Sequence, residues 1–308
     1  MIEAILYSVV GLLGLAIGSE LLVRGAVSIA QRLAISNLVT GLVIVGFATS
    51  VPEMVASIEA ALAGSPGIAW GNVVGSNLAN TLLILGATAM IMPIALRGTG
   101  RRDAVVTLIA TLVIWLVTFL QTGSIWIGIV LLAGIGAYIY WRYNHPHSDA
   151  GDDDDEPEPT TTSTWAIMLF LGGLGLLVVG GSMLVSGAID LARIFEVSET
   201  AIGLTVVAIG TSLPELAASV AAALRGKPGL AIGNVVGSNI YNILLIGGAT
   251  MSIAPFSIPA DLLTYELVVL VGSAVLFLLI VSYAKQIGRA LGAILLALYA
   301  GTIAIAFD

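Results

Sequence analysis

Cysteine is absent from this 308-residue chain, and charged side chains are scarce. Without cysteine the chain forms no disulfide and offers no thiolate as a nucleophile or metal ligand. Only 10% of the residues are Asp, Glu, Lys or Arg, against about a quarter in soluble domains, whereas 58% are hydrophobic. This composition excludes an ordinary soluble protein and predicts a protein embedded in a lipid bilayer.

Basic surface is also lacking, although the formal net charge of −8 overstates the acidity of the chain as a whole. Seven of the 19 acids lie between Asp149 and Glu158, and the remainder is 11 bases against 12 acids. Near-neutrality excludes a nucleic-acid footprint. The acidic run at 152–159 predicts a solvated, disordered linker, and it lacks the spacing of an EF-hand calcium loop.

Groups for enzyme catalysis are missing as well. The only two histidines, His145 and His147, fall in or beside the linker, so no apolar segment pairs Ser with His. We therefore expect neither an enzyme nor a bound cofactor.

What the chain does have is long apolar runs, each near the roughly 20 residues that cross a bilayer as a helix. Ten such runs predict an all-α polytopic membrane protein. The opening residues lack the basic region and cleavage site of a secretory signal, so we expect the first run to be a retained span. The expected spans are 4–24, 38–62, 70–93, 104–121, 125–142, 165–190, 200–223, 230–255, 262–283 and 289–307.

The distribution of Lys and Arg predicts the orientation of these spans. With the N-terminus outside, only Arg193 falls on the outer side, and ten basic residues fall on the inner side. Both termini are therefore expected to be extracytoplasmic and the acidic linker cytoplasmic. The inner-side residues are Arg24, Arg32, Arg97, Arg101, Arg102, Arg142, Arg225, Lys227, Lys285 and Arg289.

The strongest signal is an internal repeat. Residues 41–86 align without a gap on 203–248, an offset of 162, with 28 of 46 positions identical. The expected organisation is a first repeat at 1–143, an acidic linker at 144–164 and a second repeat at 165–308. Because each repeat has an odd number of spans, the second should enter from the opposite face. Such inverted-topology repeats are typical of secondary transporters that bind substrate near the midplane.

Each repeat places one carboxylate, Glu53 or Glu215, beside a proline in an apolar span. An ionised acid at the centre of a span costs about 2.5 kcal/mol or more, so its occurrence at matched positions favours a functional role. Proline frees the carbonyl four residues earlier, which opens the helix where Thr49, Ser50, Thr211 and Ser212 precede the acids. Carbonyl, hydroxyl and carboxylate oxygens are hard ligands that suit Ca²⁺ or Na⁺.

The second half of each repeat adds oxygen donors one helical turn apart. These are Ser76 and Asn80 in the first repeat, and Ser238 and Asn242 in the second. If the repeats face each other, two carboxylates and neutral oxygens gather in one place. Two negative charges neutralise one Ca²⁺ or hold several Na⁺, as competition between these ions requires.

The pair GFATSVPEM and AIGTSLPEL, each followed by GNVVGSN, resembles the two α-repeats of the cation/calcium exchanger superfamily, and most of all those of prokaryotic sodium/calcium exchangers. The resemblance implies antiport by alternating access, in which Na⁺ moving down its gradient drives Ca²⁺ the other way. It implies a calcium site at Glu53, Glu215 and the carbonyls of Thr49 and Thr211. It also implies flanking sodium sites at the positions of Gly46, Ala208, Ser50, Ser212, Ser76 and Ser238. In this family the first and sixth helices slide across the other eight, and the glycine-rich faces at 11–25 and 171–187 would suit sliding.

The chain departs from relatives that carry Asp where Asn80 or Asn242 stands here. Two carboxylates in place of three argue against K⁺ co-transport and for weaker competition by protons. The alternative is a proton/calcium exchanger with the same calcium site, although such proteins often carry a histidine beside the motif. A calcium channel and a non-transporting scaffold are the remaining rivals. The expected partners are the lipid bilayer, Na⁺ and Ca²⁺, with no obligate protein partner, and the expected location is a prokaryotic plasma membrane.

Overall fold

The structure of the protein, a computed structural model, describes residues 1–32, 46–96, 100–145, 162–224, 226, 228–263 and 265–306. The first part of the expected span 38–62 lies outside the described residues, and so does most of the expected linker at 144–164, including His147. Arg97, Arg225 and Lys227 lie outside them too.

Six long helices in the described part of the chain are unbroken along their length. Their bounds differ from the expected spans chiefly at α1 and α9, which are longer by several residues. They are α1 (Ile2–Arg32), α7 (Arg101–Phe119), α8 (Ile125–Asn144), α9 (Ser163–Phe195), α15 (Glu266–Tyr283) and α16 (Arg289–Ala306).

The motif segments form interrupted helices. In the first repeat they are α3 (Gly46–Thr49), α4 (Val51–Leu62), α5 (Pro66–Leu78), the π-helical turn η2 (Ala79–Ile84) and α6 (Leu85–Ile91). In the second they are α10 (Glu199–Ile202), the π-helical η3 (Gly203–Val207), α11 (Ala208–Thr211), α12 (Leu213–Leu224), α13 (Pro228–Ile240), the π-helical η4 (Tyr241–Gly247) and α14 (Gly248–Ile253).

Among the described residues, eight helical segments are long and apolar enough to cross a membrane. A ninth is the bent pair formed by Glu199–Thr211 and Leu213–Leu224. Exposed apolar side chains cover the long helices, as at Leu116, Val130, Leu171 and Val268, whereas Glu53 and Glu215 are buried. This distribution, apolar outside and acidic inside, fits a protein surrounded by lipid.

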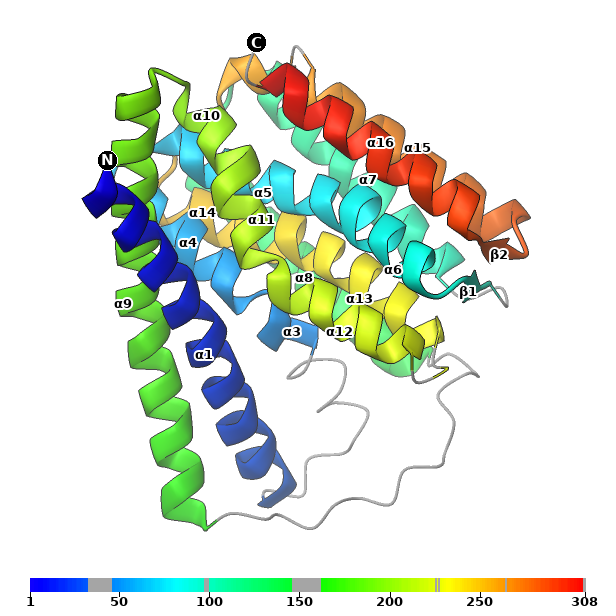
Figure 1. The fold of residues 1–308 in the computed structure, drawn as a ribbon, viewed down its shortest axis with the longest axis horizontal. Coiled ribbons are helices and arrows are strands. Elements are labelled where there is room, and N and C mark those ends of the chain that lie inside the picture. Colours follow the sequence, from blue (N-terminus) through cyan, green and yellow to red (C-terminus); the bar gives the residue numbers. More distant parts are fainter. Residues whose placement is uncertain are drawn as a thin grey trace.

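Helices α1 and α9 run antiparallel, side by side along one flank of the molecule (Figure 1). Glycines let their backbones touch: a Cβ on Gly11 would lie 2.5 Å from the Leu184 nitrogen, and one on Gly173 would lie 2.5 Å from the Leu22 nitrogen. Residues 11 and 173 are 162 apart, the repeat offset. The glycine-rich faces therefore contact mainly each other, and whether they slide stays a prediction. They join α1 to α9 as one pair.

The remaining helices pack in matched combinations. The hairpins α4–α5 and α12–α13 lie in the centre, α6 contacts α16, and α8 contacts α14 (Figure 1). A two-residue antiparallel ladder joins β1 (Ile94–Ala95) to β2 (Gln286–Ile287), and a 3₁₀ turn, η5 (Ala260–Leu263), precedes α15. The short ladder is a small departure from the expected all-α fold. It ties the segment after α6 to the segment before α16.

Candidate ion-binding site

A break in the helix precedes each motif glutamate. Ser50 separates α3 from α4 with φ −88° and ψ 4°, and Ser212 separates α11 from α12 with φ −85° and ψ 5°. Two residues later a proline lacks the N–H that would continue the ladder, so the helix restarts. In the second repeat the axis bends by 44° at this point. The bend places Glu215 in the first turn of the new helix, and Glu53 occupies the same place in α4.

Both glutamates point into the protein interior. Each is only 1% exposed. The Ser212 hydroxyl donates a hydrogen bond of 2.9 Å to Oε1 of Glu53, a contact that joins the two repeats. The Thr49 hydroxyl lies near enough to the Glu215 carboxylate to act as a donor to it, although outside full hydrogen-bond geometry, and the Glu53 carboxylate lies near enough to repel it. The fold thus brings together two acids that stand 162 residues apart.

An asparagine holds the backbone of each glutamate. The Asn72 side-chain amide donates to the Glu53 carbonyl at 3.0 Å and to the Ser57 hydroxyl at 2.8 Å. Its counterpart Asn234 donates to the Glu215 carbonyl at 3.1 Å and to the Ser219 hydroxyl at 2.9 Å. These bonds fix α5 to α4 and α13 to α12 beside the acids.

We call these contacts of Asn72 and Asn234 the asparagine clamp. The sequence did not lead to it, because the residues selected from the first half of each repeat were Glu, Thr and Ser. The available signal was recurrence, because Asn72 and Asn234, like Ser57 and Ser219, stand at identical positions in both copies. A further cross-repeat bond, from the Asn239 amide to the Thr81 hydroxyl at 2.8 Å, has no counterpart in the sequence because Ile243 replaces the threonine.

Seven of the residues selected from the sequence have buried polar atoms without a hydrogen-bond partner among the described residues. Leaving one such atom unsatisfied in the interior costs about 1–3 kcal/mol, so a cluster of them indicates a place where polar ligands enter. The acceptors among these atoms are all hard oxygens, and the two amide nitrogens are donors. The residues are Thr49, Ser50, Glu53, Asn80, Glu215, Ser238 and Asn242.

Four other selected residues, Thr211, Ser212, Ser76 and Ala208, already have hydrogen-bond partners. Thr211 Oγ1 lies 3.0 Å from the Val207 carbonyl and 3.3 Å from Asn72 Oδ1, and Ser76 donates to the same Oδ1 at 3.4 Å. The Ala208 carbonyl accepts the Ser212 N–H at 3.1 Å. Gly46 is the first residue of α3.

Asn80 and Asn242 lie in the π-helical turns η2 and η4 and are at most 1% exposed. A π turn inserts one extra residue into the helix, which changes the direction of the side chains and is frequent at functional sites. Neither asparagine has a partner for its oxygen or its nitrogen. We did not expect these turns from the sequence, which reads as continuous apolar helix at both places.

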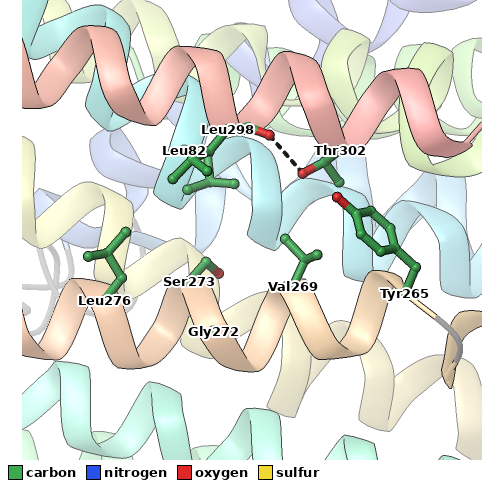
Figure 2. A pocket seen from close by; sticks show the side chains of 8 residues that line it. All are labelled: Leu82, Tyr265, Val269, Gly272, Ser273, Leu276, Leu298 and Thr302. Atoms are coloured by element: carbon green, nitrogen blue, oxygen red, sulfur yellow. Dashed lines mark hydrogen bonds between the residues drawn. The ribbon is translucent and has the colours of Figure 1, made fainter.

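No group of three or more His, Cys, Asp or Glu occurs within the described ranges, so a cation here would rely on two carboxylates and neutral oxygens. A separate cavity of about 230 Å³ lies between α15, α16 and η2 (Figure 2). Its hydroxyls at Ser273 and Thr302 bond to backbone carbonyls, and its other side chains are mostly apolar. This cavity does not include the glutamates and does not suit a cation.

Comparison with known proteins identifies the group to which this arrangement belongs. The family described as "Sodium/calcium exchanger protein" matches residues 3–144 and 165–307, almost the whole chain in two blocks. The chain is a member of the sodium/calcium exchanger family. Proteins of this family are transporters and not enzymes, and the two matched blocks of this exchanger flank the acidic segment.

Individual relatives cover this exchanger from end to end. The putative antiporter CaxA of Alkalimonas amylolytica is 38% identical over 98% of both chains. The sodium/calcium exchanger MaX1 of Methanosarcina acetivorans is 30% identical over 96% of both. Among solved structures, the sodium-calcium exchanger NCX_Mj, soaked with Na⁺ and Sr²⁺, superposes with a TM-score of 0.68 at 32% identity and covers 98% of each chain. The fold and its membrane setting are therefore those of a prokaryotic-type exchanger.

Proposed function

We propose that this exchanger is a Na⁺/Ca²⁺ antiporter that binds both ions at one central site between its repeats. The observation that carries the proposal is the pair of buried glutamates, Glu53 and Glu215, surrounded by oxygen atoms that lack partners. Two carboxylates balance the charge of one Ca²⁺, and the hydroxyl and carbonyl oxygens of the broken helices complete a hard ligand shell. The same oxygen ligands also suit Na⁺, because neutral oxygens share the coordination of the sodium ions with the two carboxylates.

The ligand roles follow the position of each atom. Calcium takes the two carboxylates and the carbonyls of Thr49 and Thr211. The sodium ions take the neighbouring oxygens of both repeats. Asn80 and Asn242 supply amide oxygens from the opposite helices, and they have no other partner. The neutral and hydroxyl donors for sodium are Gly46, Ala208, Ser50, Ser212, Ser76 and Ser238.

Transport proceeds by alternating access between two inverted five-helix repeats, 1–143 and 165–308, joined by a cytoplasmic linker at 144–164. The antiparallel course of α1 and α9 and the matched packing of α6 on α16 and α14 on α8 support this organisation (Figure 1). Ten spans and extracytoplasmic termini in a prokaryotic plasma membrane complete the proposal. Occupied sites favour switching because two bare buried carboxylates without counter-charge penalise closure of the site.

Sodium is the proposed coupling ion because, in the described part of the chain, no histidine lies near the glutamates. The named relative MaX1 is a sodium/calcium exchanger. Protons as the coupling ion are the second candidate, with the same calcium site. Two carboxylates without a third acid also argue against K⁺ as a co-substrate.

Reconstitution tests the proposal. Purified protein in Na⁺-loaded liposomes should take up radiolabelled Ca²⁺ after dilution into Na⁺-free buffer, and uptake should vanish when Na⁺ is equal on both sides at clamped pH. Uptake that ignores Na⁺ and follows an imposed pH gradient would identify a proton/calcium exchanger. Calcium flux with no counter-ion requirement would identify a channel.

A further inference from the structure

The repeats contain a second pair of matched asparagines, five residues after the clamp asparagines. Asn77 lies in α5 and Asn239 in α13, and both are buried. Neither side-chain oxygen has a hydrogen-bond partner among the described residues. A buried amide lowers stability unless its bonds are used, so the partners of the two amide nitrogens indicate what these side chains do.

The amide of Asn239 bonds across the repeats. It donates to the hydroxyl of Thr81 at 2.8 Å, and both side chains are at most 3% exposed. Asn239 belongs to α13 of the second repeat, whereas Thr81 belongs to the π-helical turn η2 of the first. This bond therefore ties the π turn of one repeat to a helix of the other.

The residue before Thr81 is Asn80, one of the proposed ion ligands. Asn80 is 0% exposed, and neither its side-chain oxygen nor its nitrogen has a partner. Its turn η2 packs against α13 and also against α12, the helix that carries Glu215. Because no bond orients the Asn80 amide, its direction depends on how firmly the backbone of η2 is held.

The backbone at Asn80 departs from the α-helical pattern. The Leu85 N–H bonds to the Asn80 carbonyl five residues earlier, where an α-helix uses the carbonyl four residues earlier. A return to the α-helical register would turn Asn80 relative to α12. The bond from Asn239 to the adjacent Thr81 opposes this change, because it fixes η2 to α13.

The sequence excludes the mirror-related bond. Residue Ile243, which matches Thr81, has no hydroxyl. The Asn77 amide donates instead to the Val73 carbonyl of its own helix, at 2.7 Å. These residues all lie in the described part of the chain, and the difference comes from one side chain.

We propose that Thr81 and Asn239 are positioning residues whose bond holds the π turn so that the Asn80 amide oxygen faces the ion site. The proposal rests on the proposed function, in which Asn80 supplies an amide oxygen to the bound ions. A ligand that is already in place strengthens binding, because the ion does not have to order the turn. Thr81 and Asn239 act only through the position of Asn80.

An isosteric substitution tests this bond. Thr81→Val removes the hydroxyl and keeps the size of the side chain, whereas Thr81→Ser keeps the hydroxyl. Equilibrium binding of radiolabelled Ca²⁺ to the purified protein is measured, and Na⁺ then displaces the Ca²⁺ at a concentration equal to each variant's own Kd. We expect Thr81→Val to raise the half-displacing Na⁺ concentration by about fivefold, the effect of one hydrogen bond, and Thr81→Ser to stay within about twofold of the parent.

Thr111→Val is the matched control. Thr111 is 0% exposed, and its hydroxyl donates to the Thr107 carbonyl of its own helix at 2.8 Å. The same chemical change in α7, which carries no proposed ligand, should leave the displacement by Na⁺ unchanged. Asn239→Leu removes the donor from the other end of the bond and should reproduce the Thr81→Val result, also where Thr81→Val does not fold.

The deciding experiment combines Thr81→Val with Asn80→Ala. If Thr81 acts through Asn80, its substitution causes no further increase once the Asn80 amide is gone, so the two effects are not additive. Additive effects would mean that the bond supports the packing in general, and they would overturn the proposal. So would unchanged displacement in both Thr81→Val and Asn239→Leu.

The parent protein and the Asn80→Ala variant separate this proposal from the proposed function. If Na⁺ does not displace Ca²⁺ from the parent, the shared ion site is refuted and the positioning with it. Unchanged displacement in Asn80→Ala would refute the ligand role of Asn80, on which the positioning depends. A normal parent, a weakened Asn80→Ala and an unaffected Thr81→Val would refute the positioning alone.

Discussion

The two copies of the motif share their residues and their local bonds but not their surroundings. In both, an asparagine ties the glutamate's carbonyl to a serine one turn along the helix, with distances that agree within 0.1 Å. Yet Asn72 is fully buried and Asn234 is half-buried. The comparison teaches that the motif forms the same clamp whether its asparagine is fully buried or half-buried.

Loss of either carboxylate should have the largest effect and should treat the copies alike. We expect Glu53→Gln and Glu215→Gln each to reduce Na⁺-driven Ca²⁺ uptake by about 100-fold or more, because each removes one of two charges that balance the cation. Proteoliposome flux measures the effect, with thermal unfolding as the control for folding. Normal flux in either variant would remove that glutamate from the site.

Glycine substitutions should separate the copies most sharply. Gly71→Ala places a methyl group against the Thr200 carbonyl, and we expect it to lower the free energy of unfolding by about 3 kcal/mol. A Cβ on Gly233 meets none of the described residues within 4 Å, so Gly233→Ala should change that free energy by less than about 0.5 kcal/mol. Thermal unfolding of both variants in detergent compares them, and equal destabilisation would contradict the unequal packing.

The clamp should contribute more to the free energy of unfolding at Asn72, which is fully buried, than at Asn234, which is half-buried. Asn72→Ala removes the bonds to the Glu53 carbonyl and the Ser57 hydroxyl and leaves the Ser76 hydroxyl without its acceptor in a fully buried place, so we expect a loss of about 3 kcal/mol in unfolding free energy, against about 1 kcal/mol for Asn234→Ala. Denaturation monitored by intrinsic fluorescence measures both losses. A larger loss from the second variant would mean that water does not compensate for the half-buried amide's partners.

The smallest difference is expected at the serines that receive the clamp. Ser57 and Ser219 are both 0% exposed, and each accepts one amide hydrogen bond. Their alanine variants should each cost about 1 kcal/mol and agree within about 0.5 kcal/mol. The same unfolding experiment applies, and a clear inequality would show that the copies differ at the clamp as well as around it.

Much of the architecture was predictable because it depends on local pattern. Four predictions are confirmed: the membrane class, the helices within the described residues, the family, and the burial of Glu53 and Glu215. The ten-span count, the inverted repeats and the ligand roles stay predictions. The glycine-rich faces predicted close approach of a helix, but which helix they contact came only from the structure, because a glycine stripe does not name its partner.

The sequence by itself determined that this protein lies in a membrane, that it carries one motif twice and that each copy places an acid beside a broken helix. Those features follow from hydropathy, identity at a fixed offset and the backbone chemistry of proline, which need no neighbour to operate. Only the tertiary structure decided that the two acids lie together, that Ser212 donates to Glu53, and that Asn72 is fully buried whereas Asn234 is half-buried. These depend on which helices pack against which, and identical residues cannot distinguish two environments that differ only in what surrounds them.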